Sequence, residues 1–241
     1  KTFTEIGLSS KKTTWTQTRF RCPYYELPQN KEGLLYDEIS SGFRKSIRQV
    51  HRKAEKDRID FRIIDGKDNK NQLETALNHL FRLHEHRADD IGRNSKFLDD
   101  KKRDYYLSIC QQANIWPGVV HFFELVDENQ VIASLFGYLI GNRFLFFQSG
   151  FDVNYADLSP GTLIIYQTML YLIDEGVREF DFLRGAEDYK FRWTSTFREN
   201  MLLAVGEGHL GQIAIHLFRI RRAIRRHGRL TGLLKWLQNK D

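Results

Sequence analysis

The chain has 241 residues, of which 41% are hydrophobic and 28% are charged, a balance typical of a folded globular protein. This composition excludes a mainly disordered chain, a collagen and a coiled coil. Only two cysteines are present, Cys22 and Cys110, too few for a disulfide framework or a CxxC zinc site. We therefore expect a reducing, cytoplasmic location.

The longest apolar run, residues 163–173, is too short to cross a bilayer. Because the chain begins at Lys1 without a signal-peptide pattern, we expect a piece of a longer protein.

The charge is unevenly distributed. The net charge is +6, but residues 209–241 alone carry +7, so the rest of the chain is close to neutral. Apolar residues of this tail recur at helical spacing (Leu210, Ile213, Ala214, Leu217, Ile220 and Ile224). Such a helix could lie on an anionic membrane, for example the inner membrane, or dock on a partner. The alternative is that the stripe packs on its own domain and leaves a solvated arginine face. A second basic run occupies residues 44–56.

The first part of the chain alternates between strand and helix patterns. Residues 13–27 are rich in β-branched and aromatic side chains and predict a strand. Residues 34–58 predict a helix, because Ile39, Phe43, Ile47 and Val50 form one apolar stripe. A short strand over 60–64 and helices over 73–87 and 99–112 follow, the last one capped by Asp99.

The period then changes to that of strands. Three apolar runs, 119–126, 131–140 and 144–151, predict an antiparallel meander. A helix over 160–175 with Gly176 as its stop leads to a strand over 179–183, and this helix is expected to cross over between parallel strands. A short helix over 188–196, a strand over 200–205 and the basic helix complete the chain. This order predicts an α/β (α+β) fold with a mixed, twisted central sheet and helices on both faces.

The helix start at residues 159–162 is a candidate anion site. Ser159 is a good N-cap, Pro160 suits the first helical position, Gly161 allows close approach, and Thr162 adds a hydroxyl. The free amides of a helix N-terminus favour an anion, and this start follows a strand. An ordinary helix start is the alternative, because no Walker or GxGxxG pattern is present.

The segment 181–193 (DFLRGAEDYKFRW) is dense in polar and aromatic residues. Phe180 and Phe182 share one face of the predicted strand and Asp181 the other, where burial would raise its pKa and suit it to accept a proton. Lys190 could bind a phosphate or an oxyanion, and Tyr189 with Trp193 could form an apolar wall. The alternative is a structural ion pair of Asp181 or Glu187 with Arg184, Lys190 or Arg192.

Histidines give weaker signals. His84 and His86 beside Glu85 lie on different faces of the predicted helix, which argues against a metal site. His121 within a strand is expected to be a core histidine. We therefore expect no metal cofactor.

Four stretches of the chain resemble a known family. They are CPYYELP (22–28), SSGFRKSIRQVHRKAEK (40–56), the run 131–165 that contains GFD…SPG, and EFDFLRGAEDYKFRW (179–193). Together they resemble the CelD/BcsL cellulose-biosynthesis acyltransferases of the GNAT acetyltransferase superfamily, which are related to FemAB-type transferases. The last two stretches are the most specific. The chain lacks the glycine-rich Q/R-x-x-G-x-G/A loop of GNAT enzymes, and Ala186-Glu187-Asp188 stands where a Glu-Pro pair is frequent in the family.

The resemblance implies a GNAT-like fold, in which two diverging strands admit the pantetheine arm of acetyl-CoA or another acyl-CoA. It implies that Asp181 and Lys190 are catalytic. The implied donor-binding residues are Ser159, Pro160, Gly161, Thr162, Gln148 and Gly150. The implied substrate-binding residues are Asp152, Arg184, Glu187, Tyr189 and Trp193. It also divides the chain into residues 1–58, the remnant of a preceding half-domain; 59–206, the GNAT-like domain; and 207–241, the basic tail.

Three functions follow as hypotheses. The first is N- or O-acyl transfer, such as acetyl transfer, from acyl-CoA to an amine or hydroxyl of a saccharide, amine or peptide acceptor, with a role in exopolysaccharide or cellulose metabolism implied by the resemblance. The second is FemAB-like aminoacyl transfer from tRNA, whose phosphates the basic helix and tail could contact. The third is a non-catalytic GNAT-fold module that binds a membrane or a partner.

Overall fold

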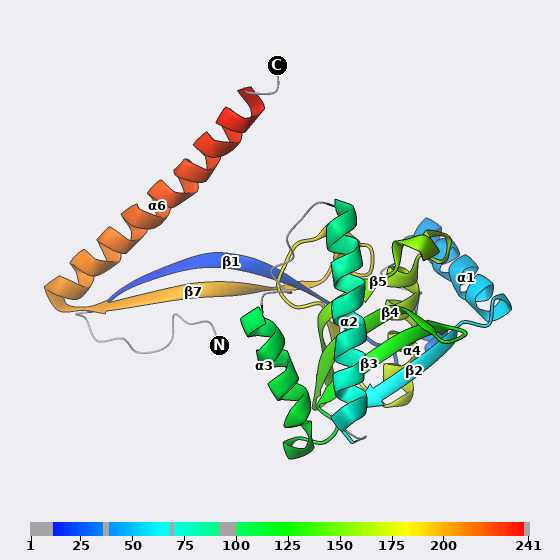
Figure 1. Ribbon diagram of the computed structural model, residues 1–241. Helices are drawn as coiled ribbons and strands as arrows, with labels where there is room; N and C mark the ends of the chain where they lie inside the picture. Colours follow the sequence, from blue (N-terminus) through cyan, green and yellow to red (C-terminus); the bar gives the residue numbers. More distant parts are fainter. Residues whose placement is uncertain (1–11, 36–38, 68–69, 92–99, 239–241) are drawn as a thin grey trace. The chain divides into compact units, whose positions relative to one another are not determined.

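The computed structural model describes residues 12–35, 39–67, 70–91 and 100–238. Seven strands form one sheet in the order β2-β3-β4-β5-β6-β1-β7 (Figure 1). Their bounds are β1 Lys12–Glu26, β2 Asp60–Asp65, β3 Val120–Asp127, β4 Gln130–Ile140, β5 Arg143–Phe151, β6 Glu179–Asp181 and β7 Phe197–Glu207. Strands β2 to β5 pair antiparallel, and β5 and β6 pair parallel, as the predicted meander and crossover require. The predicted mixed sheet is confirmed.

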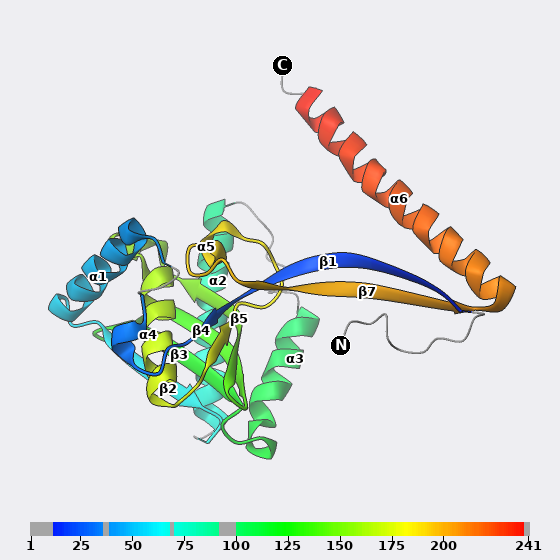
Figure 2. The same ribbon diagram turned by 180° about the vertical axis from the view of Figure 1, so that it is seen from behind.

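Helices cover both faces of this sheet because its strands are apolar on both sides. Phe122 and Phe136 pack against α2 (Lys70–Ile91) and α3 (Asp100–Gln111) on one face. Phe123 and Leu135 pack against α1 (Ser41–Lys56) and α4 (Pro160–Asp174) on the other. Figures 1 and 2 show the two helical layers from opposite sides. The short helix α5 is Asp188–Phe191 and the last helix, α6, is Gly208–Gln238.

Helix α1 shows how the sequence determines an element. It begins at Ser41, later than predicted, because the Ser40 side chain accepts a hydrogen bond from the Phe43 amide at 3.4 Å. Three residues of its predicted stripe, Phe43, Ile47 and Val50, are buried in the core that α4 also contacts. The fourth, Ile39, is buried too but precedes the helix. The opposite face of α1 carries exposed cations.

Several predicted boundaries move. Strand β6 ends at Asp181 and α5 at Phe191, both shorter than predicted, whereas β7 extends over Phe197–Glu207. Gly176 follows α4 with φ 74, which confirms it as the helix stop. Asp99, the expected cap of α3, lies outside the described residues.

The chain divides into two compact units, Arg21–Arg198 and a second unit in which Lys1–Phe20 joins Glu199–Asp241. Residues 21–58 thus belong to the first unit, where α1 packs on α4. These units do not follow the expected boundaries at 58 and 206, and the three-part division stays a prediction about the origin of the segments. None of the described helices is long and apolar enough to span a membrane.

The second unit contains its own packing. Trp15 of β1 meets Phe218 of α6 edge-to-face, with ring centroids 5.7 Å apart. The backbones of β7 and α6 approach each other at two glycines, because a Cβ built on Gly211 would lie 2.7 Å from the carbonyl carbon of Gly206. Ile215 is buried beside this contact. The helix therefore has a packed face within the unit.

Candidate functional site

Strands β5 and β6 pair only at their beginnings. Their register runs from Arg143 opposite Glu179 to Leu145 opposite Asp181, although β5 continues to Phe151. On the other side of β5, Phe146 pairs with Gly137 and Gln148 with Phe136 of β4, which leaves Phe147 as the extra residue of a β-bulge. A bulge bends its strand and increases the local twist. Strand β5 therefore leaves β6 just where pairing stops.

The chain after β6 turns to the opposite neighbour. The Phe182 amide donates to the Pro23 carbonyl at 2.9 Å, and the Gly185 amide donates to the Arg21 carbonyl at 3.0 Å. Leu183 between them has φ 56, a left-handed conformation that bends the chain. Beyond Leu145, β5 thus has no strand partner on this edge within the described part of the chain.

A cavity of about 740 Å³ occupies this gap. It is bounded by β5, the start of α4, the segment 182–193 and one side chain each from α1 and α2. Its lining consists of Phe43, His84, Phe146, Phe147, Gln148, Ser149, Phe151, Ala156, Ser159, Pro160, Gly161, Thr162, Ile165, Phe182, Leu183, Arg184, Glu187, Tyr189, Lys190, Arg192 and Trp193. All of these residues belong to the first unit. The lining joins an aromatic wall to several cations.

The predicted helix start is one wall of the cavity. Ser159 is the N-cap residue, as predicted, with φ 41, but its side chain makes no capping hydrogen bond. Instead its carbonyl accepts from the amides of Thr162 at 2.8 Å and Leu163 at 3.1 Å. The Gly161 amide has no partner among the described residues, and a Cβ there would come within 3.1 Å of the Phe151 ring. Pro160 follows at the first helical position as predicted. The arrangement leaves a helix N-terminus open to an anion.

Lys190 reaches the cavity from α5. Its side chain is only 6% exposed. The ammonium donates to the Arg184 carbonyl at 3.1 Å and pairs with Glu187 Oε2 at 2.9 Å. Burial is the largest single influence on the pKa of Glu187 and raises it, but the hydrogen bond and charge of Lys190, together with a backbone hydrogen bond, lower that pKa overall. The predicted alternative, an ion pair of Glu187 with Lys190, is therefore confirmed, and it fixes a positive charge in the lining.

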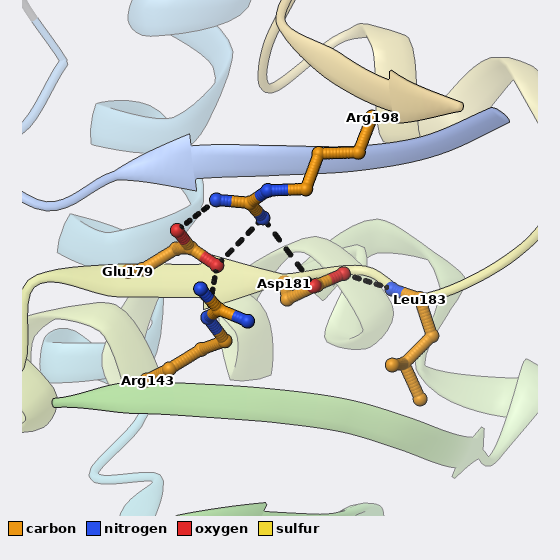
Figure 3. Close-up of polar contacts among 5 residues, drawn as sticks. All are labelled: Arg143, Glu179, Asp181, Leu183 and Arg198. Carbon is orange, nitrogen blue, oxygen red and sulfur yellow. Dashed lines mark hydrogen bonds and ion pairs between the residues drawn. The ribbon is translucent and has the colours of Figure 1, made fainter. Parts of the chain in front are cut away.

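Asp181 is placed differently. It is buried at the end of β6 but is not among the residues that line the cavity. Its Oδ1 accepts from the Leu183 amide at 2.7 Å, and its Oδ2 lies 3.6 Å from Arg198 Nη1 (Figure 3). Burial raises the pKa of Asp181 despite these partners. The structure does not bring Asp181 into the cavity with Lys190, and its ion-pair partner is none of the three cations that the sequence suggested.

The neighbouring Glu179 forms the centre of an ion network on the same strand. Its carboxylate pairs with Arg143 Nε of β5 at 2.6 Å and accepts from Arg198 Nη1 at 2.8 Å. Arg198 also stacks on the Tyr24 ring of β1, 3.7 Å from its centroid. Figure 3 shows the two arginines on either side of β6. The network thus ties β6 to both neighbours where the strands are paired.

Two further predicted residues lie outside the lining. Gly150 packs against α2, where a Cβ would come within 3.0 Å of Leu83 Cβ. Asp152 is buried and caps the following turn by accepting from the Asn154 amide at 3.0 Å, and it also accepts from the Gln130 side chain at 3.1 Å. Both therefore have structural roles in these contacts. The other predicted donor- and substrate-binding residues line the cavity.

Sequence reasoning missed eleven of the 21 lining residues, among them His84, Phe43 and Arg192. His84 of α2 contacts the Gln148 side chain of β5. Phe43 of α1 packs edge-to-face on Trp193 at 5.1 Å, and the Arg192 guanidinium lies 4.0 Å from the Phe43 ring centroid. Phe43 could only be assigned to the core from its helical spacing. No local pattern could have assigned His84 to the site, because its contact Gln148 lies 64 residues later in the sequence.

The described part of the chain contains no group of three or more His, Cys, Asp and Glu residues that could hold a metal ion. His121 is buried in β3 beside the Val119 carbonyl, as expected of a core histidine, and burial lowers its pKa.

Comparison with known proteins agrees with this geometry. A family model described as an acetyltransferase (GNAT) domain matches residues 41–191. Among solved structures, the C-terminal domain (DUF2156) of a candidate lysylphosphatidylglycerol synthetase from Agrobacterium fabrum has a TM-score of 0.55 at 13% identity, covering 84% of this chain and 65% of that one. FemX has a TM-score of 0.54 at 9% identity, covering 78% of this chain and 60% of its own. L-PGS from Bacillus licheniformis has a TM-score of 0.54 at 11% identity, covering 79% and 60%.

At these identities the likeness shows the fold alone, and this chain spans less than two thirds of each of the three structures. No curated protein matches the sequence.

Proposed function

We propose that this chain, which belongs to the acetyltransferase (GNAT) domain family, is an acyltransferase that transfers the acyl group of an acyl-CoA to an amine or hydroxyl group. The observation that carries the proposal is the cavity between the diverging strands β5 and β6, which reaches the N-terminus of α4. An extended thioester needs a long groove, an anion site and polar groups at the reacting carbonyl, and this cavity combines them.

The donor fits the residues that are present. Its phosphates would lie at the start of α4, where the Gly161 amide is unused among the described residues and the missing Cβ leaves room beside Phe151. The pantetheine arm would follow the unpaired edge of β5 beyond Leu145. Backbone amides on this edge would donate to the thioester carbonyl and stabilise the developing oxyanion.

Lys190 would stabilise the negative charge of the tetrahedral intermediate. Its ammonium is already held by Glu187 and the Arg184 carbonyl, so little reorganisation is needed during the reaction. For the proton of the acceptor, we assign His84, since an imidazole nitrogen can accept a proton and His84 lines the cavity. Gln148 would orient its ring.

Asp181 would then act as a positioning residue. By accepting from the Leu183 amide, it supports the left-handed turn that directs the segment 182–193 along the cavity. This assignment replaces direct proton transfer to Asp181, because the carboxylate lies outside the lining.

A thermal-shift titration with CoA and acetyl-CoA tests donor binding. Gly161→Ala places a methyl group within 3.1 Å of the Phe151 ring and should weaken CoA binding about tenfold. Gly42→Ala is the matched control, because it also lies at the second position of a helix but meets nothing within 4 Å. No stabilisation by either ligand, or equal binding by both variants, would contradict the donor site.

A second candidate is aminoacyl transfer from charged tRNA, in line with the resemblance to FemAB-type transferases. It is favoured by the exposed face of α1, on which Arg44, Lys45, Arg48 and Arg52 line a shallow hollow. Phe43 of the same helix lines the cavity, so α1 contributes to both the site and this basic surface. Filter binding decides the point: tRNA binding that falls steeply with salt supports this candidate, and absent or salt-insensitive binding excludes it.

The specific type and the acceptor are also proposals. We propose a CelD/BcsL-type enzyme that acts on a saccharide, amine or peptide acceptor in polysaccharide metabolism. The motifs GFD…SPG and DF…YK-x-x-W support it, since both line or flank the cavity. A panel of amino sugars, peptides and simple amines with acetyl-CoA would test it, and acetylation of none of the sugars would count against it.

A further inference from the structure

Helix α6 has two apolar faces, of which only one is covered within its unit. Ile215 and Phe218 lie on the face that meets β7 and Trp15. Leu210, Ile213, Leu217 and Ile220 follow at spacings of three and four, which places them along a single stripe. Their exposed fractions are 82%, 55%, 61% and 56%. At 100° per residue this stripe points well away from the packed face.

The charge of the helix accompanies this stripe. The sequence of α6 contains seven Arg and Lys residues and no carboxylate. Arg219 and Arg221 are exposed, and at 100° per residue Arg221 borders the stripe, whereas Arg222 is held over the rings of Trp15 and Phe218. The helix therefore presents an uncovered apolar stripe together with exposed positive charge.

The adjoining strand extends the apolar surface of the same unit. Met201, Leu203 and Val205 alternate along β7 with exposed fractions of 57%, 41% and 50%. Alternate residues of a strand share one face. The intervening Leu202 and Ala204 are more buried, as is Gly206, which contacts α6. The unit thus leaves large apolar side chains uncovered on its strand as well as on its helix.

We propose that α6 lies in the interface of an anionic lipid bilayer, with Leu210, Ile213, Leu217 and Ile220 entering the acyl boundary and the arginines contacting lipid phosphates. Burial in lipid acyl chains would stabilise the exposed apolar side chains, and anionic headgroups would stabilise the positive charge of the helix. The surface of an anionic bilayer offers both. RNA offers phosphates but no apolar phase for a stripe of leucine and isoleucine. The arrangement is independent of the acyl-transfer site, which lies in the other unit.

Vesicle sedimentation of the whole chain tests the proposal. The vesicles contain either phosphatidylcholine alone or phosphatidylcholine with phosphatidylglycerol. We expect binding only to the mixed vesicles and a decrease as salt is added, because the arginine contacts are screened. No binding to the mixed vesicles, or equal binding to both kinds, would overturn the proposal.

A pair of double variants assigns the binding to the stripe. Leu210→Gln with Leu217→Gln should lower partitioning by about tenfold or more, since both leucines lose their apolar burial in lipid. His209→Gln with His216→Gln is the matched control on exposed neighbouring positions and should stay within about twofold. Equal loss in both pairs would overturn the role of the stripe. So would a dimer in light scattering that the leucine variant dissociates while its vesicle binding is unchanged, because the stripe would then belong to a second copy.

Discussion

Strand β5 has two edges with opposite properties. On one edge it pairs with β4 from Arg143 to Phe151, interrupted only by the bulge at Phe147. On the other it pairs with β6 only to Leu145, and a cavity of about 740 Å³ begins there. The site therefore forms where the pairing of β5 with β6 ends early. The long β4–β5 pairing makes this part of the sheet rigid. The short β5–β6 pairing leaves space and unpaired backbone groups on the other edge of β5.

Different residues determine the two ends of the β5–β6 pair. At the closed end, Glu179 joins Arg143 and Arg198 across three strands. At the open end, the Phe182 amide is already used by the Pro23 carbonyl of β1, so it cannot return to β5. Both ends can be tested by substitution.

The largest effect is expected at the open end. Lys190→Met keeps most of the side-chain volume but removes the buried charge, and should lower kcat/KM about 100- to 1000-fold, as loss of a preorganised group that stabilises a transition-state charge does. Steady-state kinetics measures it, with circular dichroism to show that the variant is folded. Lys56→Met, at an exposed position of α1, is the control. Unchanged turnover in Lys190→Met would remove this lysine from the reaction.

The second-largest effect is expected in the pairing of β4 with β5. Gly137 lies opposite the bulge, and a Cβ there would come within 2.6 Å of the Leu145 carbonyl oxygen. Gly137→Ala should therefore destabilise the fold by about 1–3 kcal/mol, the usual cost of overpacking. Denaturant unfolding measures this change, with Gly42→Ala as a reference that meets no atoms. A variant as stable as the parent would mean that β4 and β5 can separate locally at the bulge.

The closed end should respond less. Glu179→Gln keeps a hydrogen-bonding side chain but removes the charge between two partly exposed arginines, so we expect a loss of about 1 kcal/mol that shrinks at high salt. Unfolding at low and high salt measures it. Arg62→Gln on β2, which has no ion pair within the described chain, is the control. A loss independent of salt would show that packing, rather than charge, holds this end.

Periodicity was sufficient to predict the meander, the crossover helix and the parallel partner of β5. The apolar runs of β3, β4 and β5 are long, and Gly176 ends α4 at its predicted place. The early end of β6 was not predictable, because residues 179–183 alternate like a strand throughout. Strand β6 ends because the Phe182 amide donates to the Pro23 carbonyl of β1 instead of pairing with β5. Since β1 lies about 160 residues earlier in the sequence, no local pattern predicts this end.

The site was predictable where local patterns coincide with the cavity. The start of α4 and the segment 184–193 are each contiguous, so both were found from sequence. The direction of the Asp181 side chain was predicted as the face opposite Phe182, but which face holds the cavity depends on the whole sheet. His84 shows the same limit, since its contact with Gln148 joins α2 to β5.

The smallest effect concerns Asp181, whose burial raises its pKa above the ordinary value of 3.8. A carboxyl with a raised pKa in the folded state contributes stability that is fully present below its unfolded pKa and is lost as pH rises through the folded value. Ionised Asp181 therefore opposes folding near neutral pH. Asp181→Asn can still accept from the Leu183 amide through its Oδ1 and carries no charge.

Thermal unfolding of Asp181→Asn and the parent across the acidic to neutral range measures this effect. The stability of the variant relative to the parent should rise with pH through the folded pKa of Asp181 and level off above it. Asp188→Asn, which removes a carboxylate at an exposed position, is the control. Turnover in Asp181→Asn should fall by less than about tenfold, as for a positioning residue. A loss as large as that of Lys190→Met would instead restore Asp181 as the group that takes the acceptor proton.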